Sequence, residues 1–203
     1  MNPVVVHLLA CLSAYLLGSI SFAVLSARIF KLADPRTYGS GNPGATNVLR
    51  TGNKKAAVFT LLGDTLKGVA AVLSARYAGL SDLGIALCGL AVFLGHIYPI
   101  FLKFKGGKGV ATAGGVLLAL APPVGAASLA TWMVVVFTTR YSSLAAIMAG
   151  ITAPLWSVIF YGVGADAAIV FLLGLTLVIK HRLNIQRLIA GTETKVGKPK
   201  NTA

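Results

Sequence analysis

Three glycine-rich or polar segments hold most of the side chains that can take part in chemistry. The first runs from Gly39 to Asn47, with Arg50 close behind it. Glycines let backbone N–H groups approach a ligand closely, and an arginine grips a phosphate with two parallel hydrogen bonds. Serine, threonine and asparagine in the same stretch add neutral hydrogen-bond partners. The segment predicts a phosphate-binding loop, and a tight turn between helices is the simpler alternative.

The second segment runs from Gly95 to Thr112 and contains Lys-Gly-Gly-Lys-Gly at 105–109, where a predicted helix begins. Free N–H groups and the helix dipole attract anions at a helix N-terminus, and lysines add positive charge. A second phosphate site follows, with cytoplasmic lysines beside a glycine turn as the simpler alternative. His96, taken alone, is more typical of a packed polar residue near a helix end than of a base.

The third segment begins at His181, just after the last apolar run. At helical spacing His181 and Asn184 share a face, with Arg187 one turn further on. A basic helix lying on anionic lipid headgroups would show the same pattern. Asp64 and Lys67 lie inside an apolar run at the i, i+3 spacing that allows an ion pair. We expect this pair to support the loops and not to perform chemistry.

Other kinds of site are excluded by their context. The string 39–44 matches G-x-G-x-x-G, but no strand precedes it and its flanks are apolar runs, so no dinucleotide-binding unit is predicted. Ala45-Thr46 follows where a P-loop has Lys-Ser/Thr. None of the three histidines begins an H-x-x-x-x-D motif, and the histidines and two cysteines form no metal-ligand cluster. We expect no metal and no cofactor.

The elements that must position these segments are membrane helices. The 203 residues are 56% hydrophobic and only 11% charged, with a mean hydropathy of +0.82, whereas a soluble domain has roughly 25% charged residues. This composition excludes an ordinary soluble domain and a disordered chain. The apolar runs, most of them near the ~20 residues of a bilayer crossing, are 4–30, 56–75, 83–102, 110–139, 142–161 and 163–179.

The distribution of charge predicts the topology. The run 110–139 contains a Pro-Pro pair at 122–123, which blocks helix continuation, so we predict two helices there and seven spans in all, with six as the alternative. All but two of the 18 lysines and arginines, Arg76 and Lys67, then lie on one side. The positive-inside rule makes that side cytoplasmic. The net charge of +13 is explained by this topology and by anionic ligands, and no nucleic-acid partner is expected.

We therefore predict an all-α fold: a polytopic membrane helical bundle with seven transmembrane helices, the N-terminus outside and the C-terminus cytoplasmic. Residues 1–203 form a single domain, and the tail after about 192 is expected to be mobile.

The three segments together resemble the bacterial acyl-phosphate:glycerol-3-phosphate acyltransferase family. The resemblance is carried by Gly-Ser-Gly-Asn-Pro-Gly-Ala-Thr-Asn at 39–47 with Arg50, by Gly-His-x-x-Pro-x-Phe-x-x-Phe-Lys-Gly-Gly-Lys-Gly-Val-Ala-Thr at 95–112, and by the polar residues of 181–193. It covers nearly the whole chain in order. Ser21 stands where the family often has proline, which bears on a bend in the first helix and not on the chemistry.

The resemblance implies transfer of a fatty acyl group from acyl phosphate to the 1-hydroxyl of glycerol 3-phosphate. The products are lysophosphatidic acid and phosphate, and the reaction is the first step of bacterial phospholipid synthesis. The implied partners are glycerol 3-phosphate, a long-chain acyl phosphate and membrane lipid. The implied location is the bacterial cytoplasmic (inner) membrane, with the active site facing the cytoplasm.

The resemblance also implies roles for individual residues. The catalytic centre comprises Ser40, Arg50, Lys108, His181 and Asn184. The residues implied to bind substrate or phosphate are Gly41, Asn42, Gly44, Thr46, Asn47, His96, Lys105, Gly106, Gly107 and Gly109. Those implied to give structural support are Asp64, Lys67 and Glu193, the last by pairing with a basic residue.

Within that centre, Arg50 and Lys108 hold phosphate, while Ser40 and Asn184 orient glycerol 3-phosphate. His181 orients or deprotonates the hydroxyl, with the substrate's own phosphate as the alternative proton acceptor. Backbone N–H groups of 41–44 and 106–109 complete the phosphate cradles.

The competing interpretation is an organic-phosphate transporter, since polar glycine loops at broken helices also build transporter sites. Such a site lies near the midplane, often between repeated halves. Here the polar motifs cluster on one side and no repeat is visible.

Overall fold

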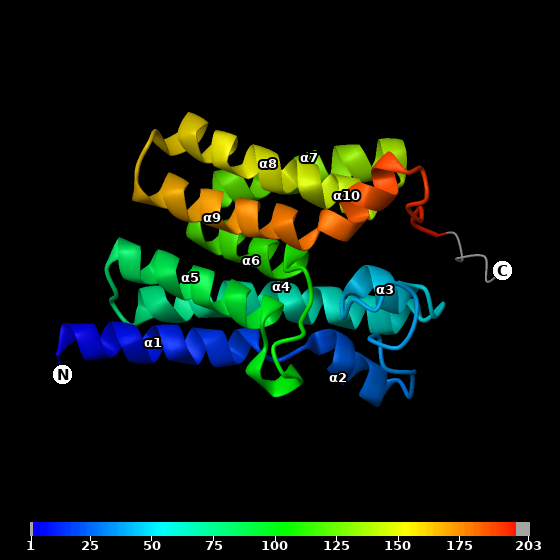
Figure 1. The fold of residues 1–203 in the computed structure, drawn as a ribbon. Helices are drawn as coiled ribbons and strands as arrows, with labels where there is room; N and C mark the ends of the chain where they lie inside the picture. Colours follow the sequence, from blue (N-terminus) through cyan, green and yellow to red (C-terminus); the bar gives the residue numbers. More distant parts are fainter. Residues whose placement is uncertain (1, 198–203) are drawn as a thin grey trace.

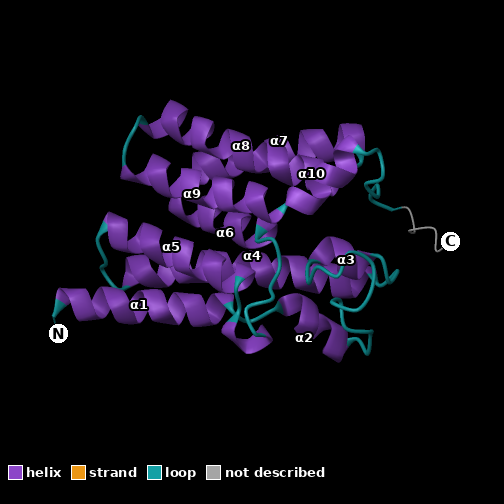
Figure 2. Ribbon diagram, viewed as in Figure 1, coloured by secondary structure: helices purple, strands orange, loops and turns teal. Residues whose placement is uncertain are grey.

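Helices make up all of the regular structure in residues 2–197, the part of the chain that the computed structural model describes, and Figure 2 shows no strand there. In chain order they are α1 (Pro3–Gly18), α2 (Phe22–Ile29), α3 (Ala45–Leu49), α4 (Lys54–Tyr77), α5 (Asp82–Ile97), the 3-10 helix η1 (Ile100–Leu102), α6 (Val110–Leu120), α7 (Pro122–Thr139), α8 (Ser142–Tyr161), α9 (Ala165–Lys180) and α10 (Arg182–Ile189).

The long helices form two layers with α6 between them (Figure 1). α1, α4 and α5 lie in one layer, and α7, α8 and α9 lie in the other. α6 packs against α4 on one side and α7 on the other. The start of α1 and the whole of α10 lie at opposite ends of the bundle (Figure 1).

The break predicted inside the run 110–139 is confirmed. α6 ends at Leu120, and α7 begins with Pro122 at its first position, where the missing N–H leaves no bond unmade. α6 lies very close to α4. If Gly115 on α6 carried a Cβ, that atom would lie only 2.1 Å from the carbonyl oxygen of Thr65 on α4. Small residues at such a contact are typical of helices packed inside a membrane.

We predicted the apolar run 4–30 as a single span. It forms two helices, α1 and α2, with a bend of 41° between them. The ammonium group of Lys67 on α4 donates hydrogen bonds to the carbonyls of Gly18 (2.9 Å) and Ile20 (2.7 Å). Those carbonyls therefore have partners outside the first helix. The hydroxyl of Ser21 then caps the N-terminus of α2. The bend is made without a proline at this position.

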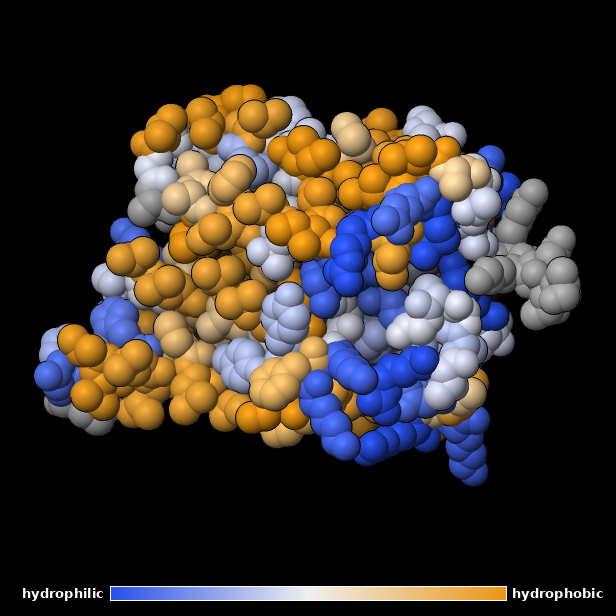
Figure 3. All heavy atoms as spheres, in the orientation of Figure 1, coloured by the Kyte–Doolittle hydropathy of each residue, from blue (hydrophilic) through white to orange (hydrophobic). Residues whose placement is uncertain are grey.

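Four helical segments of the described chain are long and apolar enough to cross a membrane: α4, α5 extended through η1, α7 and α8. The number rises to six if the bent pairs α1–α2 and α9–α10 are one span each. The remaining predicted span coincides with α6, which has 11 residues and is shorter than the four helical segments named above. Figure 3 shows an apolar surface over most of the bundle and hydrophilic residues gathered at the end where α10 lies.

Candidate active site

The three segments predicted from the sequence meet beside the first turn of α6. Lys108, two residues before that helix, donates a hydrogen bond to the side-chain oxygen of Asn184 on α10. The loop that contains Gly107 contacts the first segment. A Cβ at Gly107 would lie 2.9 Å from the carbonyl oxygen of Pro43, which belongs to that segment. Residues far apart in the chain thus form one cluster at the hydrophilic end of the bundle.

The first loop is organised around Asn47. Its side-chain N–H groups donate to the carbonyls of Pro35 (2.7 Å) and Tyr38 (3.2 Å), and its side-chain oxygen accepts from the Ser40 N–H at 3.0 Å. Asn47 is 2% exposed. This residue, predicted to contact substrate, therefore lies inside the loop and holds its shape. The N–H of Gly41 is also used within the loop, donating to Tyr38.

Arg50 lies against the same loop. A Cβ at Gly39 would be 3.2 Å from a terminal guanidinium nitrogen of Arg50, so the absence of a side chain there makes room for the arginine. Burial lowers the pKa of Arg50, the positive charge of Arg187 lowers it further, and Glu193 opposes both. Arg187 and Glu193 belong to the third segment, and their effect on the pKa of Arg50 shows that Arg50 lies near that segment.

The second loop folds back on the end of α5. The N–H groups of Gly106 and Gly107 donate to the carbonyls of Ile97 (3.2 Å) and His96 (3.1 Å). These two N–H groups were predicted to cradle phosphate, and that part of the prediction is wrong in this structure, because they are bonded within the protein. The glycines instead allow close packing, since a Cβ at Gly107 would come within 2.2 Å of the His96 ring nitrogen Nε2.

His96 lies behind the second loop and is buried, although we predicted it to face phosphate. Its Nδ1 atom is 3.4 Å from a carboxylate oxygen of Asp64. The same carboxylate oxygen lies 2.8 Å from the ammonium of Lys67, which forms the expected ion pair. Lys67 also holds the carbonyls at the α1–α2 bend, so contacts run from that bend through Asp64 and His96 to Gly107.

Lys108 is the cation of the second loop that points into the cluster. Its pKa is lowered to about 8, mainly by burial and also by the positive charges of Arg187 and Arg50, with Glu193 opposing them. The ammonium is therefore protonated at neutral pH but close to losing its proton. A bound anion would favour the charged form.

Glu193 holds the third segment in place. Its carboxylate accepts hydrogen bonds from Asn184 (2.7 Å), from Ser143 on α8 (2.8 Å) and from Arg187 (2.7 Å). Burial by itself would raise the pKa of Glu193, but these hydrogen bonds, Arg187 foremost, keep the pKa below its ordinary value. Glu193 thus fixes the amide of Asn184 opposite Lys108. We expected the tail to be mobile after about 192; its described part, residues 193–197, is held here and by a bond from the Val196 N–H to the Arg140 carbonyl. The rest of that prediction, for 198–203, lies outside the described residues.

His181 lies at the junction of α9 and α10 and is 3% exposed. Its Nδ1 atom is 2.8 Å from the carbonyl of Leu177. A carbonyl only accepts hydrogen bonds, so this contact assigns the proton to Nδ1 and leaves Nε2 unprotonated. The pKa of His181 is lowered to about 4, mainly by burial; the Leu177 bond opposes this shift, the charge of Lys108 adds to it, and Glu193 opposes it.

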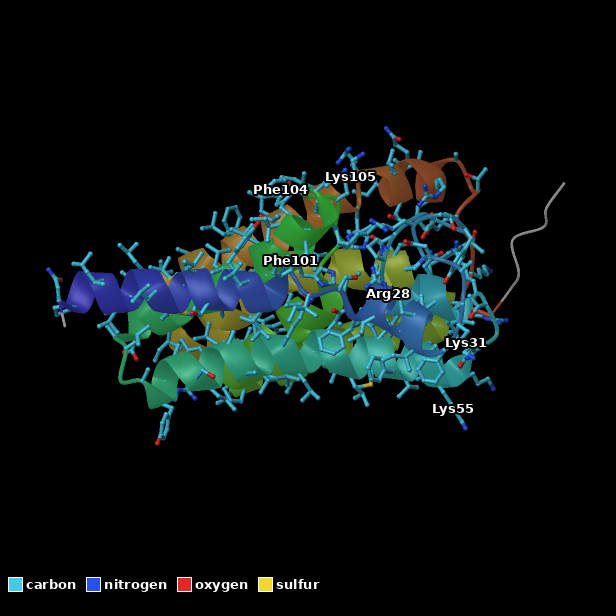
Figure 4. All side chains as sticks on the ribbon, turned by 90° about the horizontal axis from the view of Figure 1, so that it is seen from below. Arg28, Lys31, Lys55, Phe101, Phe104 and Lys105 are labelled. Carbon is cyan, nitrogen blue, oxygen red and sulfur yellow. The ribbon has the colours of Figure 1, made fainter. Side chains whose placement is uncertain are left out.

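The other predicted residues lie around this cluster. Ser40 is exposed next to Gly39, and Thr46 is exposed with its hydroxyl 3.3 Å from that of Ser142. Asn42 and Gly44 lie in the first loop, Gly109 ends the second, and Lys105 lies on the outer side of its loop beside Phe104 (Figure 4).

Ser143, which donates a hydrogen bond to Glu193, was not predicted. A serine at the start of a helix has no spacing that distinguishes it from other serines.

The cluster has the chemistry of an anion site with a base beside it. Arg50, Lys108 and Arg187 supply three positive charges, and Glu193 supplies one negative charge. His181 offers an unprotonated nitrogen close to Lys108. Among the described residues, no group of three or more histidine, cysteine, aspartate or glutamate side chains is placed to hold a metal ion.

Comparison with known proteins identifies relatives along nearly the whole chain. The family described as glycerol-3-phosphate acyltransferase matches residues 8–191. The glycerol-3-phosphate acyltransferase of Dechloromonas aromatica (strain RCB) is 60% identical over 95% of this chain and 97% of its own, and that of Ralstonia pickettii (strain 12J) is 53% identical over 100% of both.

Crystal structures of PlsY (YgiH), an integral membrane glycerol 3-phosphate acyltransferase, share the fold. Its glycerol 3-phosphate form has a TM-score of 0.89 at 41% identity, over 94% of this chain and 96% of that one. Its lysophosphatidic acid form has a TM-score of 0.86 at 40% identity, over 93% and 94%. These matches confirm the resemblance drawn from the three segments: the chain belongs to the glycerol-3-phosphate acyltransferase family of integral membrane proteins.

Proposed function

We propose that this protein transfers a fatty acyl group from acyl phosphate to the 1-hydroxyl of glycerol 3-phosphate, giving lysophosphatidic acid and inorganic phosphate. The observation that carries the proposal is the meeting of Arg50 and Lys108, from two glycine loops, with His181 and Asn184 from a third segment. Both substrates carry phosphate, and the cluster has an excess of positive charge. The names and bound forms of the relatives support glycerol 3-phosphate as the acceptor.

In the proposed reaction, the 1-hydroxyl oxygen attacks the acyl carbon of the mixed anhydride. The new ester bond forms as the bond between the acyl carbon and the phosphate oxygen breaks, and phosphate leaves with the electron pair. The hydroxyl proton passes to Nε2 of His181 or to the phosphate itself. Phosphate is a good leaving group, so the protein needs to supply orientation and charge stabilisation more than a covalent nucleophile.

The proposed roles follow the position of each group. Arg50 and Lys108 hold phosphate oxygens, and the low pKa of Lys108 marks it as a cation that gains most from an anion beside it. Asn184, fixed by Glu193, and Ser40 orient glycerol 3-phosphate. His181 has the proton on the ring nitrogen that faces the backbone, which supports its use of the other nitrogen as a hydrogen-bond acceptor.

We further propose seven membrane crossings, with the N-terminus outside and the site facing the cytoplasm of the bacterial inner membrane. The distribution of lysine and arginine supports this orientation. The opposite positions of the start of α1 and of α10 support an odd number of crossings (Figure 1). In this arrangement α6 is the fourth crossing in chain order and brings the total to seven.

The decisive experiment is an acyl-transfer assay on the purified protein in lipid. Labelled glycerol 3-phosphate is supplied with palmitoyl phosphate in one reaction and palmitoyl-CoA in another, and lysophosphatidic acid is measured. Product from palmitoyl phosphate alone establishes donor and acceptor together. Product only from palmitoyl-CoA keeps the acyltransferase and overturns the donor. Folded protein that gives no product in either reaction overturns the proposal.

A further inference from the structure

The connection between α5 and α6 exposes large aromatic side chains beside lysines. Phe101 and Phe104 are 63% and 57% exposed. Lys103 and Lys105 are exposed next to them. We refer to residues 100–105 as the aromatic-lysine loop. Exposed apolar side chains of this size are stabilised when lipid or a partner covers them.

An unusual backbone turns this loop outward. Lys103 (φ 52°) and Phe104 (φ 61°) are consecutive residues in the left-handed conformation, which residues other than glycine rarely adopt. The turn is closed by a hydrogen bond from the N–H of Phe104 to the carbonyl of Pro99 at 2.9 Å. Figure 4 shows Phe101, Phe104 and Lys105 on this projecting turn. A backbone kept in a rarely used conformation is typical of a functional segment.

The loop lies where the apolar surface of the bundle ends. The apolar stretch of α5 and η1 ends at Leu102, inside the loop. Figure 3 shows apolar residues giving way to hydrophilic ones over this part of the bundle. Lys180, at the end of α9, has its ammonium 4.7 Å from the ring centre of Tyr98, just before the loop. Aromatic and basic residues together at helix ends are typical of the lipid headgroup region.

We propose that the aromatic-lysine loop is a binding surface for anionic phospholipid. Phe101 and Phe104 enter the boundary of the acyl chains, and Lys103 and Lys105 contact the headgroup phosphate. The exposed lysines supply the complementary charge, and the aromatic side chains supply the apolar contact that a soluble acidic partner would not need. Each basic residue near an anionic membrane surface strengthens attachment about fivefold.

Binding at this surface reaches the proposed active site through the backbone. The loop continues without a break into Gly106 and Gly107, whose N–H groups are bonded to the end of α5, and then into Lys108. Anionic lipid that fixes the loop therefore fixes the approach to Lys108. This consequence rests on the proposed function, whereas lipid binding itself does not.

The binding is tested by fluorescence quenching, which needs no enzymatic activity. Phe104→Trp is made in a protein that also carries Trp132→Phe and Trp156→Phe, so that the new indole is the only one. The protein is placed in phosphatidylcholine–phosphatidylglycerol membranes in which either lipid is brominated, at equal mole fraction. We expect brominated phosphatidylglycerol to quench at least about twofold more than brominated phosphatidylcholine, as local enrichment by two lysines requires.

Two charge-neutralised variants separate this site from general surface charge. Lys103→Gln with Lys105→Gln should make the two brominated lipids equivalent. Lys54→Gln with Lys55→Gln removes the same charge from the exposed start of α4, away from the loop (Figure 4), and should leave the preference intact. Equal quenching by the two lipids without these changes would overturn the proposal, as would loss of the preference in the Lys54/Lys55 variant. An indole quenched by neither lipid would show that the loop does not contact the membrane, and would also overturn the proposal.

Discussion

The ammonium group of Lys108 donates a hydrogen bond to the amide oxygen of Asn184, which joins the glycine loop before α6 to the helix after α9. The other end of the same amide donates to Glu193. A cation, an amide and a carboxylate therefore form one chain of contacts. Because the amide cannot turn over without losing both bonds, its oxygen is fixed toward the lysine.

The first prediction concerns the charge of Lys108. With a pKa of about 8, this lysine is charged below that pH and loses its charge above it. The KM for glycerol 3-phosphate should therefore rise above pH 8, by up to about tenfold per pH unit. In Lys108→Arg the side chain stays charged throughout, so its KM should show no such rise. The measurement is KM between pH 6.5 and 9.5, and parallel profiles would contradict the role.

The second prediction concerns His181. His181→Ala should lower turnover by about 10²–10⁴-fold if the ring takes the hydroxyl proton, with little change in the yield of folded protein. A turnover within about threefold of the unaltered enzyme would remove this ring from the mechanism and leave the substrate phosphate as the proton acceptor.

His181 also gives the fold a pH dependence. Its pKa of about 4 lies below that of an unfolded histidine, so between about pH 6.5 and 4 the unfolded chain binds a proton that the folded protein does not. Stability should fall as pH decreases through this window, by up to about 1.4 kcal/mol per pH unit. Melting temperatures of the unaltered protein and of His181→Gln should converge as the pH is lowered.

The third prediction tests the close packing of the second loop. Gly107→Ala places a methyl group 2.2 Å from the His96 ring and 2.9 Å from the Pro43 carbonyl. The two loops must move apart, and the KM for glycerol 3-phosphate should rise about tenfold or more. Gly114→Ala on α6 is the matched control, because its Cβ meets nothing within 4 Å, and it should leave KM unchanged. Equal KM values for both variants would show that the packing does not position the loop.

The fourth prediction concerns the carboxylate that anchors the tail. Glu193→Gln removes the charge that faces Arg187, whose side chain is 38% exposed, so the loss of stability should be modest, about 1 kcal/mol. Limited proteolysis should cut the tail sooner. Asp34→Asn is the control, since it breaks an ion pair with Arg36 in which both side chains are about a third exposed or more, and the tail should stay protected.

The fifth prediction concerns the buried pair of Asp64 and Lys67, which are 2% and 3% exposed. Lys67→Met leaves a buried carboxylate without its ion-pair partner, and the free energy of unfolding should fall by about 3–5 kcal/mol. The double variant Asp64→Asn with Lys67→Met should recover part of this loss. Unfolding in detergent measures both, and a double variant less stable than the single one would contradict the pairing.

The positions of the helices were largely predictable, because apolar runs and Pro122 mark where they begin and end. A bend near Ser21 was implied only by the resemblance, through the proline that the family often has there. The residues of this chain do not predict it, since the group that fixes it, the ammonium of Lys67, comes from another helix. The residues around the bend contain no pattern that predicts a hydrogen bond from a lysine on another helix. The residue types at the bend are compatible with a straight helix.

The candidate site was predictable in its residue types and not in its geometry. The residue types of Lys108 and Asn184 predict a role for each, but spacing along the chain carries no information about the contact between them. Asn47 was expected to face substrate, and its burial depends on carbonyls that only the folded loop presents. Ser143 could not be distinguished from other serines until Glu193 was placed beside it.

The shortness of α6 has a consequence for where the two substrates meet. Its 11 residues extend only about 17 Å at 1.5 Å per residue, against a hydrocarbon core of about 30 Å. In the proposed seven-span arrangement, α6 ends at the outer face, so a helix this short begins well below the cytoplasmic surface. Lys108 then sits at a recessed depth. The proposed acyl phosphate donor, held in the lipid, would reach it by lateral diffusion alone, while glycerol 3-phosphate would have to descend from the proposed cytoplasmic side to meet it.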